Sequence, residues 1–163
     1  MRKVKSCKES VCESRKIAMP DEINPHGTLF GGVMMSWIDK MGYMCAQNYA
    51  EWKKTVTANI DQIEFILPVH SGDHVALKAV VTHVGRSSME IEVICFKENP
   101  VDKTRNLVAK AYMTFVAVNE SGKGREVPQL LFENVDDELK NTQALMRIKS
   151  RNNLKDLLVS HSF

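Results

Sequence analysis

The chain has 163 residues, of which 44% are hydrophobic and 26% are charged, and its formal net charge is +2. This length suits one domain with a sizeable core, and a charge so close to zero excludes the broad basic surface that nucleic acid requires. No apolar run approaches the roughly 18 residues of a membrane span, and the basic N-terminus lacks the apolar core of a signal peptide. We therefore expect a cytoplasmic protein with neither nucleic-acid nor membrane partners.

The N-terminal residues 1–13 are charged and aperiodic, so we expect a flexible leader before a domain at residues 14–125. Residues 14–19 fit a short strand that Pro20 ends, and residues 20–28, rich in proline and glycine, fit a loop.

The four cysteines form no C-x-x-C pair and do not show the pattern of a small secreted disulfide-bonded domain, so free thiols are expected. They are Cys7, Cys12, Cys45 and Cys95.

A long helix is expected over residues 29–49, because apolar residues recur there at helical spacing. They form two adjacent stripes, and so wide an apolar surface predicts a helix largely wrapped by other structure. The first stripe holds Met34, Ile38, Met41 and Cys45, and the second holds Val33, Trp37 and Met44.

After residue 54 the apolar period changes to two, which indicates strands joined by short turns. One long helix followed by such strands predicts an α+β fold in which an antiparallel sheet curls around the helix. Beyond Pro128, scattered leucines predict a C-terminal helical tail at residues 126–163. The expected long strands are residues 56–67, 75–81, 89–95 and 107–118.

The start of the expected helix carries the residues with the clearest chemistry. Gly31 and Gly32 expose backbone amides that can stabilise a developing negative charge. About two turns further on, Asp39 is a candidate general base or direct nucleophile, and Asn24 in the preceding turn can orient water or a carbonyl. These are parts of an acyl-transfer or acyl-hydrolysis site. The structural alternatives are an ion pair of Asp39 with Lys40 or with a charge from a neighbouring subunit, an Asx turn or helix cap at Asn24, and close helix packing at the two glycines.

Several segments resemble landmarks of the hotdog-fold acyl-CoA thioesterases. Residues 19–32, MPDEINPHGTLFGG, are similar to the segment that opens the central helix of that family. Residues 60–69, the following Gly72-Asp73 and residues 84–89, VGRSSM, resemble its later landmarks in the same order. The resemblance covers about residues 15–118 and implies a hotdog fold, a sheet wrapped around one long central helix, here with a C-terminal helical extension.

The resemblance implies hydrolysis of acyl-CoA thioesters to carboxylic acid and coenzyme A, a reaction of lipid metabolism that needs no metal, cofactor or catalytic serine. The family's catalytic pair, an asparagine before the helix and an acid within it, falls on Asn24 and Asp39. The turn Gly85-Arg86-Ser87-Ser88 resembles the one that contacts coenzyme A.

The family works as dimers whose sheets join edge to edge, and often as trimers of dimers. We therefore expect a homodimer and a homohexamer, in which each site takes Asn24 from one subunit and Asp39 from its neighbour. Three basic residues are looser candidates for the nucleotide phosphates, although a plain solvated charge explains each of them better. They are Lys54, Lys123 and Arg125.

Two alternatives remain on the same scaffold. A non-catalytic acyl-CoA sensor would bind the thioester without turning it over, and it would have no need of Asp39. A 3-hydroxyacyl-thioester dehydratase would use His26, because the spacing from His26 to Asp39 resembles the His-to-acid spacing of hotdog dehydratases. The proline-rich loop that those enzymes carry between the two residues is absent here. The histidines show no metal-ligand spacing. They are His26, His70, His74, His83 and His161.

Overall fold

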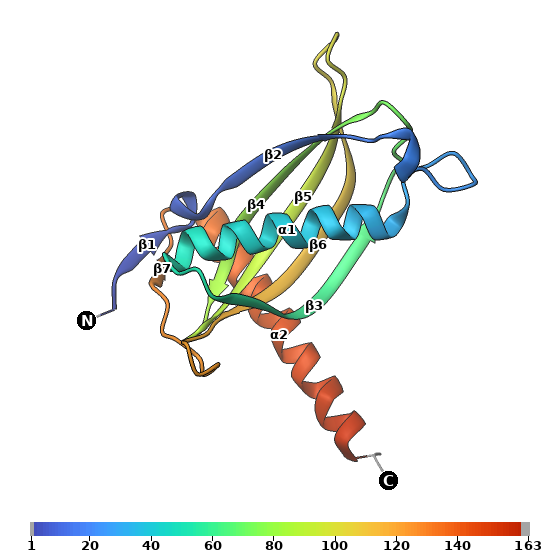
Figure 1. Ribbon diagram of the computed structural model, residues 1–163. Coiled ribbons are helices and arrows are strands. Elements are labelled where there is room, and N and C mark those ends of the chain that lie inside the picture. Colours follow the sequence, from blue (N-terminus) through green and yellow to red (C-terminus); the bar gives the residue numbers. More distant parts are fainter. Residues whose placement is uncertain (1, 161–163) are drawn as a thin grey trace.

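A five-stranded antiparallel sheet forms the centre of the computed structural model, which describes residues 2–160 (Figure 1). Its strand order is β2-β4-β5-β6-β3, so β2 and β3 are the two edges. The α+β architecture and the expected strands are confirmed, with ends that differ by a few residues. The strands are β2 (Cys12–Ile17), β3 (Thr55–Phe65), β4 (His74–Val84), β5 (Ser88–Glu98) and β6 (Arg105–Ala117).

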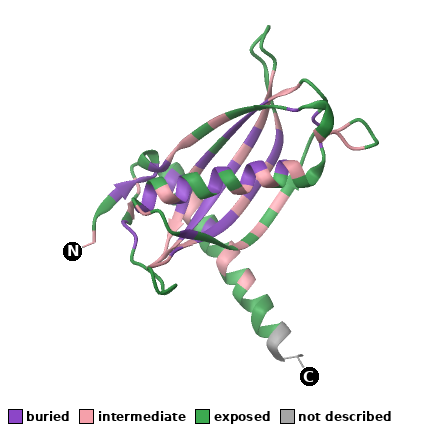
Figure 2. Ribbon diagram, viewed as in Figure 1, coloured by how far each residue is buried: buried purple, intermediate pink, exposed green. Residues whose placement is uncertain are grey.

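The central helix α1 (Gly31–Ala50) lies across the concave face of this sheet (Figure 1). The first apolar stripe is buried as expected, and it packs on inward-facing residues of β5 and β6 such as Ile91 and Met113. The second stripe is buried at Trp37, but Met44 is 46% exposed. The expectation of a helix wrapped along both stripes is therefore wrong for a single chain, because the sheet covers only one side of α1 (Figure 2).

The opposite face of the sheet is polar and is covered by the C-terminal helix α2 (Val135–Ser160). Alternation along β5 points Glu90 and Glu92 away from α1, and both are buried beneath α2. Arg147 Nη2 lies 2.7 Å from Glu90 Oε1, and Arg151 Nη1 lies 2.6 Å from Asp61 Oδ2 on β3. The expected helical tail is thus present and is held to the sheet by ion pairs.

The segment expected to be a flexible leader, residues 1–13, contains a short strand and a 3₁₀ helix. Strand β1 (Val4–Ser6) pairs in parallel with β7 (Gln129–Leu131), the segment that precedes α2. The 3₁₀ helix η1 (Cys7–Ser10) follows, and the Val81 amide donates to Ser10 Oγ at 2.9 Å. The amine of Lys5 is buried and donates to the carbonyls of Asn48 and Tyr49, which neutralises the negative end of α1.

Residues 161–163, including His161 and the last part of the expected tail, lie outside the described residues. Within residues 2–160, no helix is both long enough and apolar enough to cross a membrane. The same part of the chain holds no group of three or more His, Cys, Asp or Glu side chains arranged to bind a metal ion. The domain boundaries at residues 14 and 126 stay predictions.

Candidate functional site

Asn24 lies in the turn between the 3₁₀ helix η2 (Pro20–Glu22) and α1, and its side chain organises that turn. Its Nδ2 donates to Thr28 Oγ1 at 2.9 Å, and its Oδ1 accepts from the backbone amides of His26 and Thr28. This is the Asx-turn role. A primary amide has two N–H groups, so one remains for a substrate or water. His26 contributes its backbone to the turn and is exposed.

Gly31 and Gly32 are the first two residues of α1, and both are exposed. The backbone N–H groups of Gly31 and Gly32 have no hydrogen-bond acceptor among residues 2–160. A Cβ on Gly31 would lie 3.8 Å from the Phe65 ring and one on Gly32 would lie 3.5 Å from Phe30, both ordinary contacts. The packing of one chain therefore does not require glycine at either position. Two free amides at the positive end of a long helix suit an oxyanion.

Asp39 is half-buried in the middle of α1 and is held by a residue on the sheet edge. Thr57 Oγ1, on β3, donates to Asp39 Oδ1 at 2.8 Å. Within the described chain Asp39 makes no ion pair, so the structural alternative of a bridge to Lys40 is not realised in the subunit. The sequence reasoning missed Thr57, because a threonine in a β-rich segment gives no sign of which helical residue it faces.

The turn Gly85-Arg86-Ser87-Ser88 joins β4 to β5 and is fixed by its backbone. The Gly85 amide donates to the Ser88 carbonyl at 2.9 Å, and a Cβ on Gly85 would lie 2.6 Å from Ser88 Oγ, so a larger residue here would make the Ser88 side chain rotate away. The Ala117 amide donates to the Ser87 carbonyl and the Val127 amide to the Arg86 carbonyl. The Arg86 side chain is exposed and, within residues 2–160, has no carboxylate partner.

Arg2 connects the N-terminus to this turn, which sequence reasoning did not foresee. Its Nη2 donates to the Gly85 carbonyl at 2.8 Å, and its Nε donates to the Val127 carbonyl at 2.9 Å. The same guanidinium thus bridges the turn and the segment that flanks it. The looser basic candidates lie near the C-terminal end of α1, where Arg125 stacks on Trp52 and Lys54 pairs with Glu120.

One subunit does not bring the expected site residues together. With a rise of 1.5 Å per residue, Asp39 lies roughly 12 Å along the helix axis from Gly31. The turn at residues 85–88 lies toward the other end of α1, because Ser87 bonds to Ala117, and the next residue, Val118, bonds to Lys54 just after the helix. The helix itself is roughly 30 Å long. Asn24 and the glycine amides lie before and at the start of α1, Asp39 and Thr57 lie at its middle, and the turn lies toward its far end.

The surface around Asp39 is apolar and includes the β3 edge. An exposed sheet edge has backbone groups available for pairing, and a contiguous apolar patch beside it marks an interaction surface. The large exposed apolar residues on α1 and β3 are Met35, Tyr43, Met44, Val56, Ile60 and Phe65.

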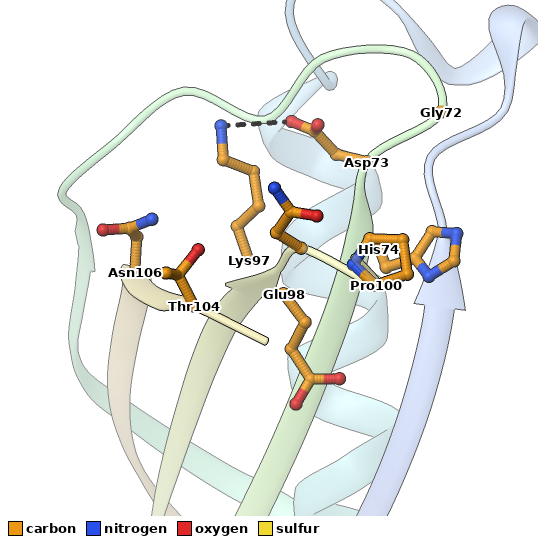
Figure 3. Close-up of a pocket in the computed structure, with 9 residues that line it drawn as sticks. Gly72, Asp73, His74, Lys97, Glu98, Pro100, Thr104 and Asn106 are labelled. Carbon is orange, nitrogen blue, oxygen red and sulfur yellow. Dashed lines mark ion pairs between the residues drawn. The ribbon is translucent and has the colours of Figure 1, made fainter. Parts of the chain in front are cut away.

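A different recess, of about 380 Å³, lies at the ends of β4, β5 and β6 (Figure 3). Its charges pair with one another, since Lys97 Nζ lies 3.4 Å from Asp73 Oδ2 and Glu98 bonds to Arg105. The landmark residues Gly72 and Asp73 and the histidine His74 line it, but it contains none of the residues expected to act in catalysis or to bind coenzyme A, and its carboxylates, Asp73 and Glu98, are both paired. We therefore place the candidate site at α1.

Comparisons with known proteins identify the family. The model of the thioesterase superfamily matches residues 26–103, which include Gly31, Asp39 and the 85–88 turn. An acyl-CoA thioester hydrolase of Bacillus subtilis that is itself uncharacterised is 37% identical over 149 residues, covering 91% of this chain and 86% of that protein. This chain belongs to the thioesterase superfamily. The predicted resemblance is thereby confirmed.

Solved members of the superfamily share the whole architecture. An alanine variant of an acyl-CoA hydrolase from Staphylococcus aureus, in complex with coenzyme A, superposes with a TM-score of 0.91 at 30% identity and covers 98% of this chain and 95% of its own. An apo-hexameric acyl-CoA thioesterase gives a TM-score of 0.89 at 31% identity and covers 94% of this chain and 97% of its own. The hotdog fold, including the C-terminal helix, is confirmed by these structures.

Proposed function

We propose that this protein hydrolyses acyl-CoA thioesters at a site that two subunits share. The curated relatives include acyl-CoA thioester hydrolases at 37% and 35% identity, which supports this reaction. The enzyme class predicted from the sequence, a thioester hydrolase, is the same. The observation that carries the shared site is the separation along α1. Asn24 and the free backbone amides of Gly31 and Gly32 lie at one end of the helix. Asp39 lies roughly 12 Å further along it, with an exposed apolar surface around it.

The groups have complementary roles in thioester hydrolysis. The amides of Gly31 and Gly32 receive the carbonyl oxygen as it gains negative charge, at the positive end of the helix. Asp39 either takes a proton from water, whose oxygen attacks the carbonyl carbon, or attacks that carbon itself to give a mixed anhydride that water then hydrolyses to the free acid and Asp39. In both cases the C–S bond breaks and the coenzyme A thiolate takes up a proton. Both roles use the Asp39 carboxylate, and the Thr57 hydroxyl donates a hydrogen bond to one of its oxygens, which positions it.

The remaining groups bind and orient the substrate. The free N–H of Asn24 is available to hold the attacking water or the carbonyl. The turn at residues 85–88 has an exposed guanidinium on Arg86 and a backbone fixed by Arg2, which suits the phosphates and pantetheine of coenzyme A. No metal and no further cofactor enters this scheme.

A homodimer through the β3 edges completes the site. A two-fold axis beside β3 would pair the two edges antiparallel and set the two α1 helices side by side in opposite directions. The start of one helix then approaches the middle of the other, where Asp39 lies. Hexameric solved neighbours, among them a thioesterase from Yersinia pestis, support the further assembly of three such dimers into a homohexamer.

Subunit mixing tests the shared site. Asn24→Ala and Asp39→Ala variants are each inactive in this scheme, since each damages both sites of its own dimer. In a mixed dimer one site carries both substitutions and the other carries neither. Reassociation of equal amounts should therefore restore roughly one quarter of wild-type hydrolysis, measured as thiol release from butyryl- and octanoyl-CoA.

A mixture that stays inactive, although mass spectrometry shows mixed dimers, would contradict the shared site. Wild-type protein that binds acyl-CoA without releasing thiol would support the sensor alternative instead. Hydration of crotonyl-CoA would support the dehydratase.

A further inference from the structure

An apolar recess of about 300 Å³ opens beside the amide of Gly31. It lies between the start of α1 and the segment that follows β3. The Phe65 ring would be 3.8 Å from a Cβ on Gly31, so this ring forms the wall next to the proposed oxyanion position. Principal lining residues are Gly31, Met34, Phe65, Leu67, Val69 and Val108.

Burial distinguishes the floor of this recess from its rim. Met34, Val69 and Val108 are at most 4% exposed and form the floor, whereas Phe65 and Leu67 are 54% and 46% exposed and form the rim. Met34 follows Gly31 by three residues, which places both on the same face of α1. Gly31 and Met34 thus line the same recess.

The walls of the recess are fixed by backbone hydrogen bonds. The Leu29 amide donates to the Val69 carbonyl at 2.7 Å, and the Ile66 amide donates to the Val108 carbonyl at 2.8 Å. These bonds join the segment before α1, the segment after β3 and strand β6. The backbone around the recess is thus fixed within one subunit.

We propose that this recess holds the acyl chain of the thioester and that Met34 and Val108 limit the chain length. The proposal rests on the proposed function, because it places the thioester carbonyl at the amides of Gly31 and Gly32. The acyl chain is bonded to that same carbonyl carbon, and the recess is the apolar space that begins there.

The volume of the recess indicates the substrate class. A dry apolar cavity of about 150 Å³ accommodates benzene, with its six carbons, so about 300 Å³ accommodates on the order of ten carbons. The favoured substrates are therefore short- and medium-chain acyl-CoA thioesters, with a decline well before palmitoyl-CoA.

The test compares the chain-length profiles of kcat/KM for acyl groups of two to sixteen carbons. Met34→Ala should deepen the floor and raise the ratio of dodecanoyl- to butyryl-CoA hydrolysis by about tenfold, and Val108→Phe should lower the ratio of octanoyl- to butyryl-CoA hydrolysis by a similar factor. The matched control is Met89→Ala, which truncates an equally buried methionine that does not line the recess. Because these are ratios, a loss of folded protein cancels out.

Binding measured without turnover separates this proposal from the proposed function. S-alkyl-CoA thioethers of the same chain lengths cannot be hydrolysed, and their Kd values should follow the same profile and the same shifts. If the wild type hydrolyses no thioester but the thioether profile shifts with Met34→Ala, the recess stands and the hydrolase function fails. Profiles that Met34→Ala and Val108→Phe leave unchanged, or a wild-type preference for palmitoyl-CoA, would overturn the proposal.

Discussion

Thr57 Oγ1 donates a hydrogen bond of 2.8 Å to Asp39 Oδ1, and this contact joins the edge of the sheet to the middle of the central helix. Thr57→Val removes the donor and keeps the shape of the side chain. A hydrogen bond to a charged group contributes about 1.5–3 kcal/mol, so we expect kcat to fall roughly 10- to 100-fold. Steady-state thiol release from octanoyl-CoA measures this change.

Thr55→Val is the matched control for Thr57→Val. Thr55 lies two residues earlier on β3, and its buried Oγ1 has no hydrogen-bond partner in the described part of the chain. A methyl group in place of an unsatisfied hydroxyl should leave kcat unchanged and raise the free energy of unfolding by about 1 kcal/mol. If both valine variants lose the same activity, the strand, and not the Thr57 hydroxyl, carries the effect.

Arg2→Met should weaken the binding of coenzyme A. The substitution removes the donors that hold the carbonyls of Gly85 and Val127, and we expect KM for octanoyl-CoA to rise about tenfold with little change in kcat. The octanoyl thioester of N-acetylcysteamine, which lacks the nucleotide, should show no change in kcat/KM. Arg15→Met is the control, since Arg15 pairs with Glu98 at the other end of β4 and β5. Equal losses with both substrates would exclude a role through the turn.

Arg147→Met should strongly destabilise the fold. Glu90 has a fully buried side chain whose charge is balanced by Arg147 at 2.7 Å, and Thr82 Oγ1 adds one hydrogen bond at 2.8 Å. Leaving this carboxylate without its cation should cost about 3 kcal/mol, measured by urea unfolding at a fixed protein concentration. The double variant Glu90→Met with Arg147→Met should recover most of that loss, and a double variant as unstable as the single one would contradict this account.

Cys12 should be the thiol that reacts near neutral pH. A side-chain hydrogen bond from Cys45 lowers the pKa of Cys12 to about 7, whereas burial raises the pKa of Cys95 to about 12. The thiolate is the nucleophile, so alkylation of Cys12 by iodoacetamide should rise with pH through about 7 while Cys95 stays unmodified. Peptide mass spectrometry follows both sites. Cys45→Ala removes the donor and should move the Cys12 midpoint to higher pH; an unchanged midpoint would exclude Cys45 as the cause.

The elements that repeat an apolar pattern were predictable from the sequence. The stripe that contains Ile38 and the alternation around Ile91 gave the central helix and its sheet, because packing on one face imposes those periods. The N-terminal segment carries no such period, since Lys5 is buried by capping a helix end and Ser10 by receiving a strand amide. Those contacts join residues far apart in the chain, and no local pattern encodes them.

The site residues that belong to a motif could be predicted from the sequence. Those that depend on how a strand packs against a helix or another segment could not. Asn24, Gly31 and Asp39 belong to a segment that resembles a family, so they could be named in advance; their catalytic roles stay predictions. Thr57 and Arg2 act through partners fixed only by how β3 meets α1 and how β1 reaches the turn. Such pairings depend on the tertiary fold.

The two faces of the sheet should respond oppositely to the ions around the protein. On the inner face, α1 packs on apolar side chains, and salting-out ions such as sulfate strengthen that kind of burial. On the outer face, α2 is held by Arg147, Arg151 and Lys140 against carboxylates on the strands, and mobile ions weaken the exposed part of such pairs. A change in ionic strength can therefore loosen the last helix of the chain while it tightens the central one.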